Sequence, residues 1–286
     1  MHSKLPVSKY TSIKQLLYSY LIKSISIDTY NPENICTKGE KIPLYKGRDD
    51  NRVFYTSSVS LRLSKSQNRK AMELASAIAS DLSGTCDGVF SIQIVPPGWI
   101  NFELTHSTLA TWLQSLVVGS LGRAEETIDG QSPMLNSLFA VEYAHARCCS
   151  LVLLAHREGL IKLREPVPNT SPAFWDVISP NPLPWLNCDG TLQLNHPDER
   201  RLIGELIQVV DNIECPDVSG SVKWEKVALN LSQAFEKFWS NCRIWGEVKI
   251  TSPERAQARL GLLMATQSVL KFVLEENLGV FAPLEL

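Results

Sequence analysis

The stretch from Leu138 to Ala155 constrains the fold more than any other, because it predicts one long amphipathic helix. At about 100° per residue, small and apolar side chains gather on one face of that helix. They are Val141, Ala144, Cys148, Val152 and Ala155. Tyr143, Arg147 and Ser150 fall on the opposite face, where a core would not place them. Because other helices must cover a single apolar stripe, we expect an all-α bundle in the second half of the chain.

Three later segments carry the same helical period and complete this bundle. The first is predicted to be capped by Asn195, with Pro197 in its opening turn. The second covers residues 224–242, and the third begins with a capping box at residues 251–254 and closes at Gly279. The predicted core positions of the first two are Leu202, Leu206, Val209, Val210 and Ile213, then Ala228, Leu231, Phe235, Phe238 and Cys242.

The first half of the chain alternates between helical and extended patterns, so we expect an α+β domain there. The predicted elements are a helix over residues 10–27, a strand over 53–58, a helix over 60–82, strands over 92–95 and 100–104, and a helix capped by Ser107. The strict alternation of residues 100–104 after a Pro-Pro-Gly turn indicates a half-buried antiparallel pair.

These patterns predict two domains, which 286 residues are enough to build. We expect the α+β domain over residues 1–118, a polar linker over 119–136 and the bundle over 137–286. A proline-rich insertion interrupts the bundle at about residues 164–190 and carries two tryptophans, Trp175 and Trp185. Such a segment is either a partner-binding loop in extended conformation or an excursion whose tryptophans pack back on the bundle.

Composition narrows the classes of protein that this chain can be. A net charge of −2 and a pI near 6.2 argue against a non-specific nucleic-acid binder, but they leave room for a local basic face. No apolar run reaches the roughly 18 residues that a membrane span needs. Seven cysteines without framework spacing fit a reducing compartment, so we expect a cytoplasmic protein.

The order of residues also resembles a known family. Glu142-Tyr-Ala-His-Ala-Arg147 is similar to the opening helix of the DALR anticodon-binding domain at the C-terminus of arginyl-tRNA synthetases, and residues 231–244 and 278–283 follow the same family's pattern. Residues 57–65 and Pro97-Gly-Trp-Ile-Asn-Phe102 resemble the additional N-terminal domain of those enzymes. The resemblance implies contacts to the tRNA elbow from the first domain and to the anticodon stem-loop from the second.

Two places depart from the family's pattern. Arg52-Val-Phe-Tyr-Thr56 replaces a Gly-Asp-Tyr-like approach, and Pro283-Leu-Glu-Leu286 replaces the usual Pro-Glu-Arg-Met-like tail. In the synthetases a nucleotide-binding catalytic domain lies between the two matching pieces, and this sequence has no His-x-Gly-His motif. Arg62-Leu-Ser-Lys-Ser66 imitates the second ATP-binding motif, but no nucleotide fold precedes it. We therefore expect a protein that is not an enzyme, with no cofactor and no metal.

Several polar and aromatic side chains are candidate tRNA contacts. Tyr143 and Arg147 lie one turn apart and offer a ring and a guanidinium plane for stacking on an unpaired base. The alternatives for this pair are an ordinary cation–π or solvated pair, or burial against another helix. Asn230, Gln233, Lys237 and Asn241 are candidates for contacts to base edges. Arg62, Lys65 and Arg69 are candidates for phosphate contacts, and Arg255 and Arg259 are further candidate tRNA contacts. A solvated helix face explains those on the predicted helices equally well.

The other reactive residues of the opening helix are interpreted as core residues. His145 lies at the edge of the apolar stripe and has no nucleophile beside it in the sequence, which favours a packed histidine over a general base. Cys148 and Cys149 point about 100° apart on a helix and have no Cys-x-x-Cys partner, so they are not expected to bind metal.

Two hypotheses for function follow. The first is a non-catalytic tRNA-binding protein derived from arginyl-tRNA synthetase, with arginine tRNA as the expected partner. The second is a protein-interaction scaffold that has kept the bundle and lost RNA binding, with the proline-rich loop as its protein contact.

Overall fold

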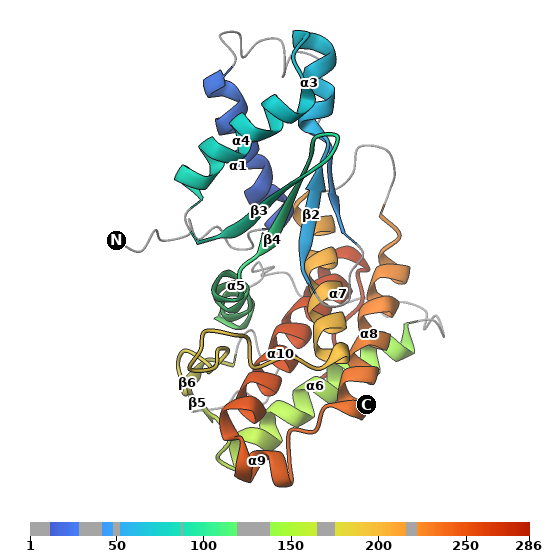
Figure 1. Cartoon of the computed structure of the whole chain (residues 1–286). Coiled ribbons are helices and arrows are strands. Elements are labelled where there is room, and N and C mark those ends of the chain that lie inside the picture. The colour runs from blue at the N-terminus through green and yellow to red at the C-terminus, as the bar shows by residue number, and fades with distance from the viewer. Residues whose placement is uncertain are drawn as a thin grey trace. The chain divides into compact units, whose positions relative to one another are not determined.

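The computed structural model divides the chain into two compact units, residues 12–109 and 110–286 (Figure 1). The structure describes residues 12–28, 42–47, 52–86, 88–118, 138–164, 175–215 and 222–286. The predicted linker at 119–136 and the proline-rich residues 165–174 lie outside these ranges. Within the described residues, no helix has both the length and the apolar character that crossing a bilayer requires.

Within the described residues, the first unit packs helices against a four-stranded antiparallel sheet of strand order β1-β2-β4-β3 (Figure 1). The strands are β1 (Leu44–Lys46), β2 (Phe54–Ser57), β3 (Phe90–Val95) and β4 (Trp99–Leu104). The helices are α1 (Ile13–Asp28), α3 (Val59–Gln67) and α4 (Ala71–Thr85). A further helix, α5 (His106–Val118), begins in this unit and ends in the second, because the division falls inside it.

Alternation along β4 decides which face of the sheet is covered. Ile100, Phe102 and Leu104 are buried, whereas the residues between them stay partly exposed. The antiparallel pairing of β3 with β4 confirms the predicted pair. Gly98 closes the turn between these strands with a φ of 147°, and a Cβ there would lie 2.9 Å from the side chain of Ala71. Glycine is therefore needed at this point of contact.

Two predictions in the first unit are wrong. The single helix expected over residues 60–82 is two helices, because Asn68 adopts a left-handed conformation (φ 51°) that ends α3, and Lys70 is extended. Asparagine is one of the few residues that adopts this conformation readily. The cap of α5 is Thr105 and not Ser107, since the Thr105 hydroxyl accepts a hydrogen bond from the backbone N–H of Thr108 at 3.3 Å.

The second unit is a bundle built around α10, which packs against three other long helices, as Figure 1 shows. Its elements are α6 (Phe139–Arg157), β5 (Lys162–Leu163), β6 (Val177–Ser179), α7 (Pro197–Glu214), α8 (Trp224–Asn241), α9 (Glu247–Thr251), α10 (Pro253–Phe272) and the π-helical turn η1 (Val273–Asn277). The apolar stripe of α6 and the predicted core positions of α8 are all buried, which confirms both patterns. On α7 the same holds except for Ile213, which is half-buried.

Both predicted helix caps of the bundle are wrong in detail. His196 caps α7 in place of Asn195, because its ring Nδ1 accepts a hydrogen bond from the backbone N–H of Asp198 at 3.2 Å. Ser252 stands at the cap position of α10 without a side-chain hydrogen bond, so the capping box expected at 251–254 does not form. The predicted close at Gly279 is confirmed by its positive φ of 65°.

The described part of the proline-rich insertion packs back on the bundle. Trp175 and Trp185 are buried, and the indole of Trp185 donates a hydrogen bond to the Gln114 side chain at 2.8 Å. The Trp185 ring also occupies the space beside Gly261, where a Cβ would lie 2.5 Å from it. The interpretation of the insertion as an extended partner-binding loop is therefore wrong for these residues, and the packing alternative is confirmed.

Candidate nucleic-acid interface

Arg147 of α6 lies against an aromatic ring from a distant part of the chain. Its guanidinium carbon is 5.2 Å from the ring centroid of Trp239, in the last turn of α8. Trp239 in turn meets Trp245 edge-on, with ring centroids 5.8 Å apart and an interplanar angle of 75°. We call these three residues the Arg147–Trp239 cluster. A cation–π contact of this kind contributes about 0.5–1 kcal/mol at an exposed site.

Tyr143 lies one turn before Arg147 and has a different neighbour. It stacks on Phe139 with a centroid distance of 6.3 Å and an interplanar angle of 23°. Both rings are unusually open to solvent, at 46% for Tyr143 and 54% for Phe139. Tyr143 stays outside the core, as predicted, whereas Arg147 is half-buried against Trp239 of another helix, which was one of the alternatives for this residue. Together they give the start of α6 an aromatic and cationic surface with the properties that stacking on unpaired bases requires.

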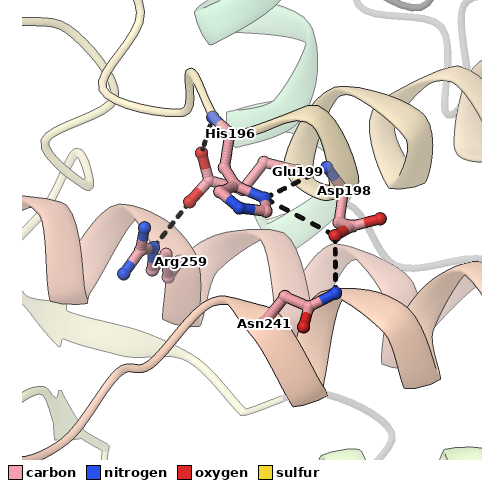
Figure 2. Close-up of polar contacts among 5 residues, drawn as sticks. All are labelled: His196, Asp198, Glu199, Asn241 and Arg259. Carbon is pink, nitrogen blue, oxygen red and sulfur yellow. Dashed lines mark hydrogen bonds and ion pairs between the residues drawn. The ribbon is translucent and has the colours of Figure 1, made fainter.

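The polar face of α8 does not join this surface. Its four candidates are all exposed, namely Asn230, Gln233, Lys237 and Asn241. Lys237 precedes Trp239 by two residues, which places their side chains about 200° apart around the helix axis. Asn241 is also engaged, since its amide donates a hydrogen bond to Asp198 Oδ2 at 2.8 Å (Figure 2). The polar candidates of α8 and the surface formed by Tyr143 and Arg147 are therefore two separate groups.

Arg259 is not a surface residue, and its prediction as a tRNA contact is wrong. Figure 2 shows it facing Glu199 of α7, with Arg259 Nε 2.5 Å from Glu199 Oε1. The Glu199 side chain is fully buried and its other oxygen accepts a hydrogen bond from the backbone N–H of His196 at 2.8 Å. Arg259 Nη1 donates to the carbonyl of Arg243 at 2.6 Å. A guanidinium with these partners is part of the core of the bundle.

Arg255 lies one turn before Arg259 and is half-buried. Its Nε is enclosed and has no hydrogen-bond partner among the described residues. The Arg255 side chain is therefore less exposed than the sequence predicted, and its exposure does not by itself indicate an RNA contact.

The basic candidates of the first unit lie on and after α3. Arg62 and Lys65 are exposed on this helix, and Arg69 is exposed just beyond its end. Leu63 between them is buried, so residues 62–66 form one turn of an ordinary amphipathic helix. We call Arg62, Lys65 and Arg69 the α3 basic edge.

The sequence reasoning missed the outer face of the sheet. Tyr45, Thr56, Asn101 and Gln93 lie opposite one another on four successive strands, and Tyr45 is 63% exposed. The Thr56 hydroxyl donates to Asn101 Oδ1 at 2.8 Å, so the Asn101 amide group is oriented with its NH₂ as the remaining donor. The alternation of residues 100–104 was the signal that every second side chain faces away from the core. This face combines an aromatic ring with hydrogen-bond donors and acceptors of the kind that contact the edges of bases.

His145 is a core residue, as expected. Its Nδ1 donates to the carbonyl of Pro283 at 2.8 Å, and its Nε2 accepts from the Gln267 amide at 3.1 Å. The pKa of His145 is lowered to about 4: burial is the largest cause, the hydrogen bond to Pro283 opposes it, and the positive charge of Lys271 adds a smaller lowering. The ring is therefore neutral and its lone pair is occupied, which does not suit a general base.

The two adjacent cysteines of α6 are also core residues. Both are buried, and burial raises the pKa of the Cys149 thiol to about 12. Metals bind the thiolate form, which is suppressed here. Among the residues that the structure describes, no three His, Cys, Asp or Glu side chains are grouped to hold a metal ion.

Comparison with known families matches both units. The model of the DALR anticodon binding domain matches residues 141–286, and the model of the arginyl tRNA synthetase N terminal domain matches residues 13–104. Residues 105–140 are all that separate the two matched regions. No solved structure gives a match.

Curated relatives are arginine–tRNA ligases. The ligase of Synechococcus sp. (strain JA-3-3Ab) is 32% identical over 149 residues, which are 52% of this chain and 22% of the ligase. The chloroplastic/mitochondrial ligase of Arabidopsis thaliana is 30% identical over 138 residues, 48% of this chain and 17% of the ligase. The match thus spans about one fifth of the length of these relatives.

Each of the two structural units corresponds to one of the two family matches. The α+β unit carries the synthetase N-terminal domain, and the helical unit built around α10 carries the anticodon-binding domain. With half of its residues in the second match, the chain belongs to the DALR anticodon binding domain family, as an arginyl-tRNA synthetase-like protein without a catalytic domain between its two matched domains.

Proposed function

We propose that this chain is a non-catalytic tRNA-binding protein that contacts the anticodon stem-loop with its helical bundle and the tRNA elbow with its α+β unit. The observation that carries the proposal is the surface at the start of α6, where Tyr143 is exposed and Arg147 lies over Trp239. It belongs to the domain that matches the anticodon-binding family.

The chemistry of this surface suits a single-stranded loop. Unpaired bases of RNA bind by stacking on aromatic rings and guanidinium planes, which contributes about 1–3 kcal/mol per base. The Phe139–Tyr143 pair offers one stacking platform, and the Arg147–Trp239 cluster offers a second one turn further along α6. Neither depends on a large positive field, which agrees with a net charge of −2.

The first unit supplies contacts of a different kind. The α3 basic edge offers three cations for phosphates, and the outer face of the sheet offers Tyr45 and Asn101 for a base. Two modest contacts on one chain bind more tightly together than either does alone, because the second forms at high effective concentration. We propose arginine tRNA as the partner, because the relatives are arginine–tRNA ligases.

The absence of a catalytic role is part of the proposal. Only residues 105–140 lie between the matched domains, which is too short a stretch for a nucleotide-binding domain. The segment that imitates an ATP-binding motif is a turn of α3 whose Leu63 packs in the core. We therefore expect no ATP-dependent adenylate formation by this chain.

The scaffold hypothesis has lost part of its support. Its contact was the proline-rich loop, and the tryptophans of that loop are buried against the bundle. The near-neutral charge and the altered C-terminal residues 283–286 still favour a protein partner, so the scaffold remains the second candidate.

The test is a titration of labelled arginine tRNA with purified protein at low salt, where phosphate contacts are strongest. We expect saturable binding that weakens at least tenfold in Tyr143→Ala/Arg147→Ala, since two stacking contacts of about 1 kcal/mol or more are lost. Two exposed residues of the same unit serve as matched controls, Arg201→Ala for the charge and Ile250→Ala for the apolar side chain, and both should bind like the wild type. No retention of tRNA by the wild type would refute the proposal.

A further inference from the structure

We infer that the buried Glu199–Arg259 ion pair is a positioning element for the Arg147–Trp239 cluster and thereby sets the RNA affinity of the bundle. The inference rests on the proposed function, because RNA is the ligand whose affinity it concerns. The pair itself is shielded from solvent, so it acts through the residues it holds and not by touching RNA.

One guanidinium joins three parts of the bundle. Arg259 of α10 contacts Glu199 in the first turn of α7 through Nε, and it donates through Nη1 to the backbone carbonyl of Arg243. Arg243 lies two residues beyond the end of α8, where backbone carbonyls have no partner within the helix. Arg259 therefore fixes the chain at the point where it leaves α8.

That point lies between the two tryptophans of the cluster. Trp239 is in the last turn of α8, and Trp245 follows Arg243 by two residues. The edge-on contact of their rings at 5.8 Å requires the turn between them to keep its path. If the turn shifts, Trp245 leaves the edge of Trp239, and the ring over which Arg147 lies loses its support.

The choice of an ion pair at this place indicates a role other than stability. A fully buried carboxylate and its arginine lose their hydration, and apolar residues of similar volume often replace such pairs without loss of stability. Apolar residues cannot donate a hydrogen bond to the Arg243 carbonyl. The ion pair therefore adds a hydrogen bond that fixes the position of this turn, in addition to the apolar packing of the buried Cys242 and Ile244.

Two variants separate positioning from folding. Arg259→Lys keeps the charge beside Glu199, but a single ammonium lacks the planar fork that reaches two acceptors in different directions. Glu199→Met/Arg259→Met removes both charges together and leaves no unpaired ion. Cys242 and Ile244 should keep the turn in the core, so both variants are expected to fold with wild-type far-UV circular dichroism.

The readout of position is near-UV circular dichroism, because two indoles in edge contact couple optically. The signal that belongs to the tryptophan pair is defined by the difference between the wild type and Trp245→Phe. We expect both variants to lose this signal and to bind arginine tRNA at least about fivefold more weakly, the loss that follows from one weakened stacking contact. Arg164→Gln breaks an exposed ion pair of the same unit (2.8 Å) and should change neither measurement.

Three outcomes overturn the inference or its basis. A folded variant that keeps the tryptophan signal shows that Glu199 and Arg259 do not position the cluster. A variant that loses the signal and binds tRNA like the wild type shows that the position of the cluster does not set affinity. If the wild type itself does not bind tRNA, the proposed function fails with the RNA part of this inference, whereas the spectroscopic comparison still decides the positioning part.

Discussion

The burial of His145 predicts a specific loss of stability in mild acid. The pKa of this imidazole is about 4 in the folded chain, against an ordinary value of 6.5, chiefly because burial disfavours the charged ring. Between these two values the unfolded chain binds a proton that the folded chain does not. The stabilisation of the folded chain by the neutral His145 ring is therefore complete above pH 6.5 and is lost as the pH falls towards 4. A difference of about 2.5 between the two pKa values, at about 1.4 kcal/mol per unit, corresponds to about 3 kcal/mol.

The assay is urea unfolding of the wild type and of His145→Gln at pH 7, 5.5 and 4.5. Carboxylates also titrate in this range, so the informative quantity is the difference in pH dependence between the two proteins. We expect the free energy of unfolding of the wild type to fall by about 2–3 kcal/mol more than that of the variant between pH 7 and 4.5. His106→Gln, at an exposed position in α5, is the matched control and should follow the wild type. Equal pH dependence in the wild type and His145→Gln would refute the reasoning.

Three further outcomes are expected. Gly261→Ala should lower the free energy of unfolding by about 1–3 kcal/mol in a thermal melt, because its Cβ would meet the buried ring of Trp185; an unchanged melting temperature would contradict this packing. Replacing Arg62, Lys65 and Arg69 with glutamine should reduce the slope of log Kd against log salt for tRNA by about 2, and an unchanged slope would show that the α3 basic edge does not meet phosphates. In arginylation by a Synechococcus ligase, the chain should raise the KM for tRNA and leave kcat unchanged; inhibition that excess tRNA cannot relieve would contradict a shared binding mode.

Local periodicity was enough to predict much of the fold. The apolar stripe of α6 and the core positions of α8 are repeated every three or four residues, and the β4 pattern every two, so they can be read without knowing any partner. The residues at which helices begin and end were harder to predict. Asn68 ends α3 within a segment of continuous helical pattern, and His196 takes the cap position from Asn195 because its ring nitrogen reaches a backbone N–H.

The candidate site could be predicted only in part, for the same reason. The sequence placed Arg147 outside the core, but its neighbour Trp239 comes from another helix and no local pattern links the two. Arg259 was expected at the surface because its partner Glu199 lies 60 residues away in the sequence. A charged residue on an apolar face is the one local sign of such a pair, and it does not identify the partner.

Nuclease footprinting of arginine tRNA bound to the full chain tests the central claim most directly. The proposed function predicts two protected regions on one tRNA, the anticodon loop and the elbow. In Tyr143→Ala/Arg147→Ala, the anticodon loop should become accessible before the elbow does. A tRNA that stays open to cleavage in both regions at saturating protein, or is protected only elsewhere, would contradict the account.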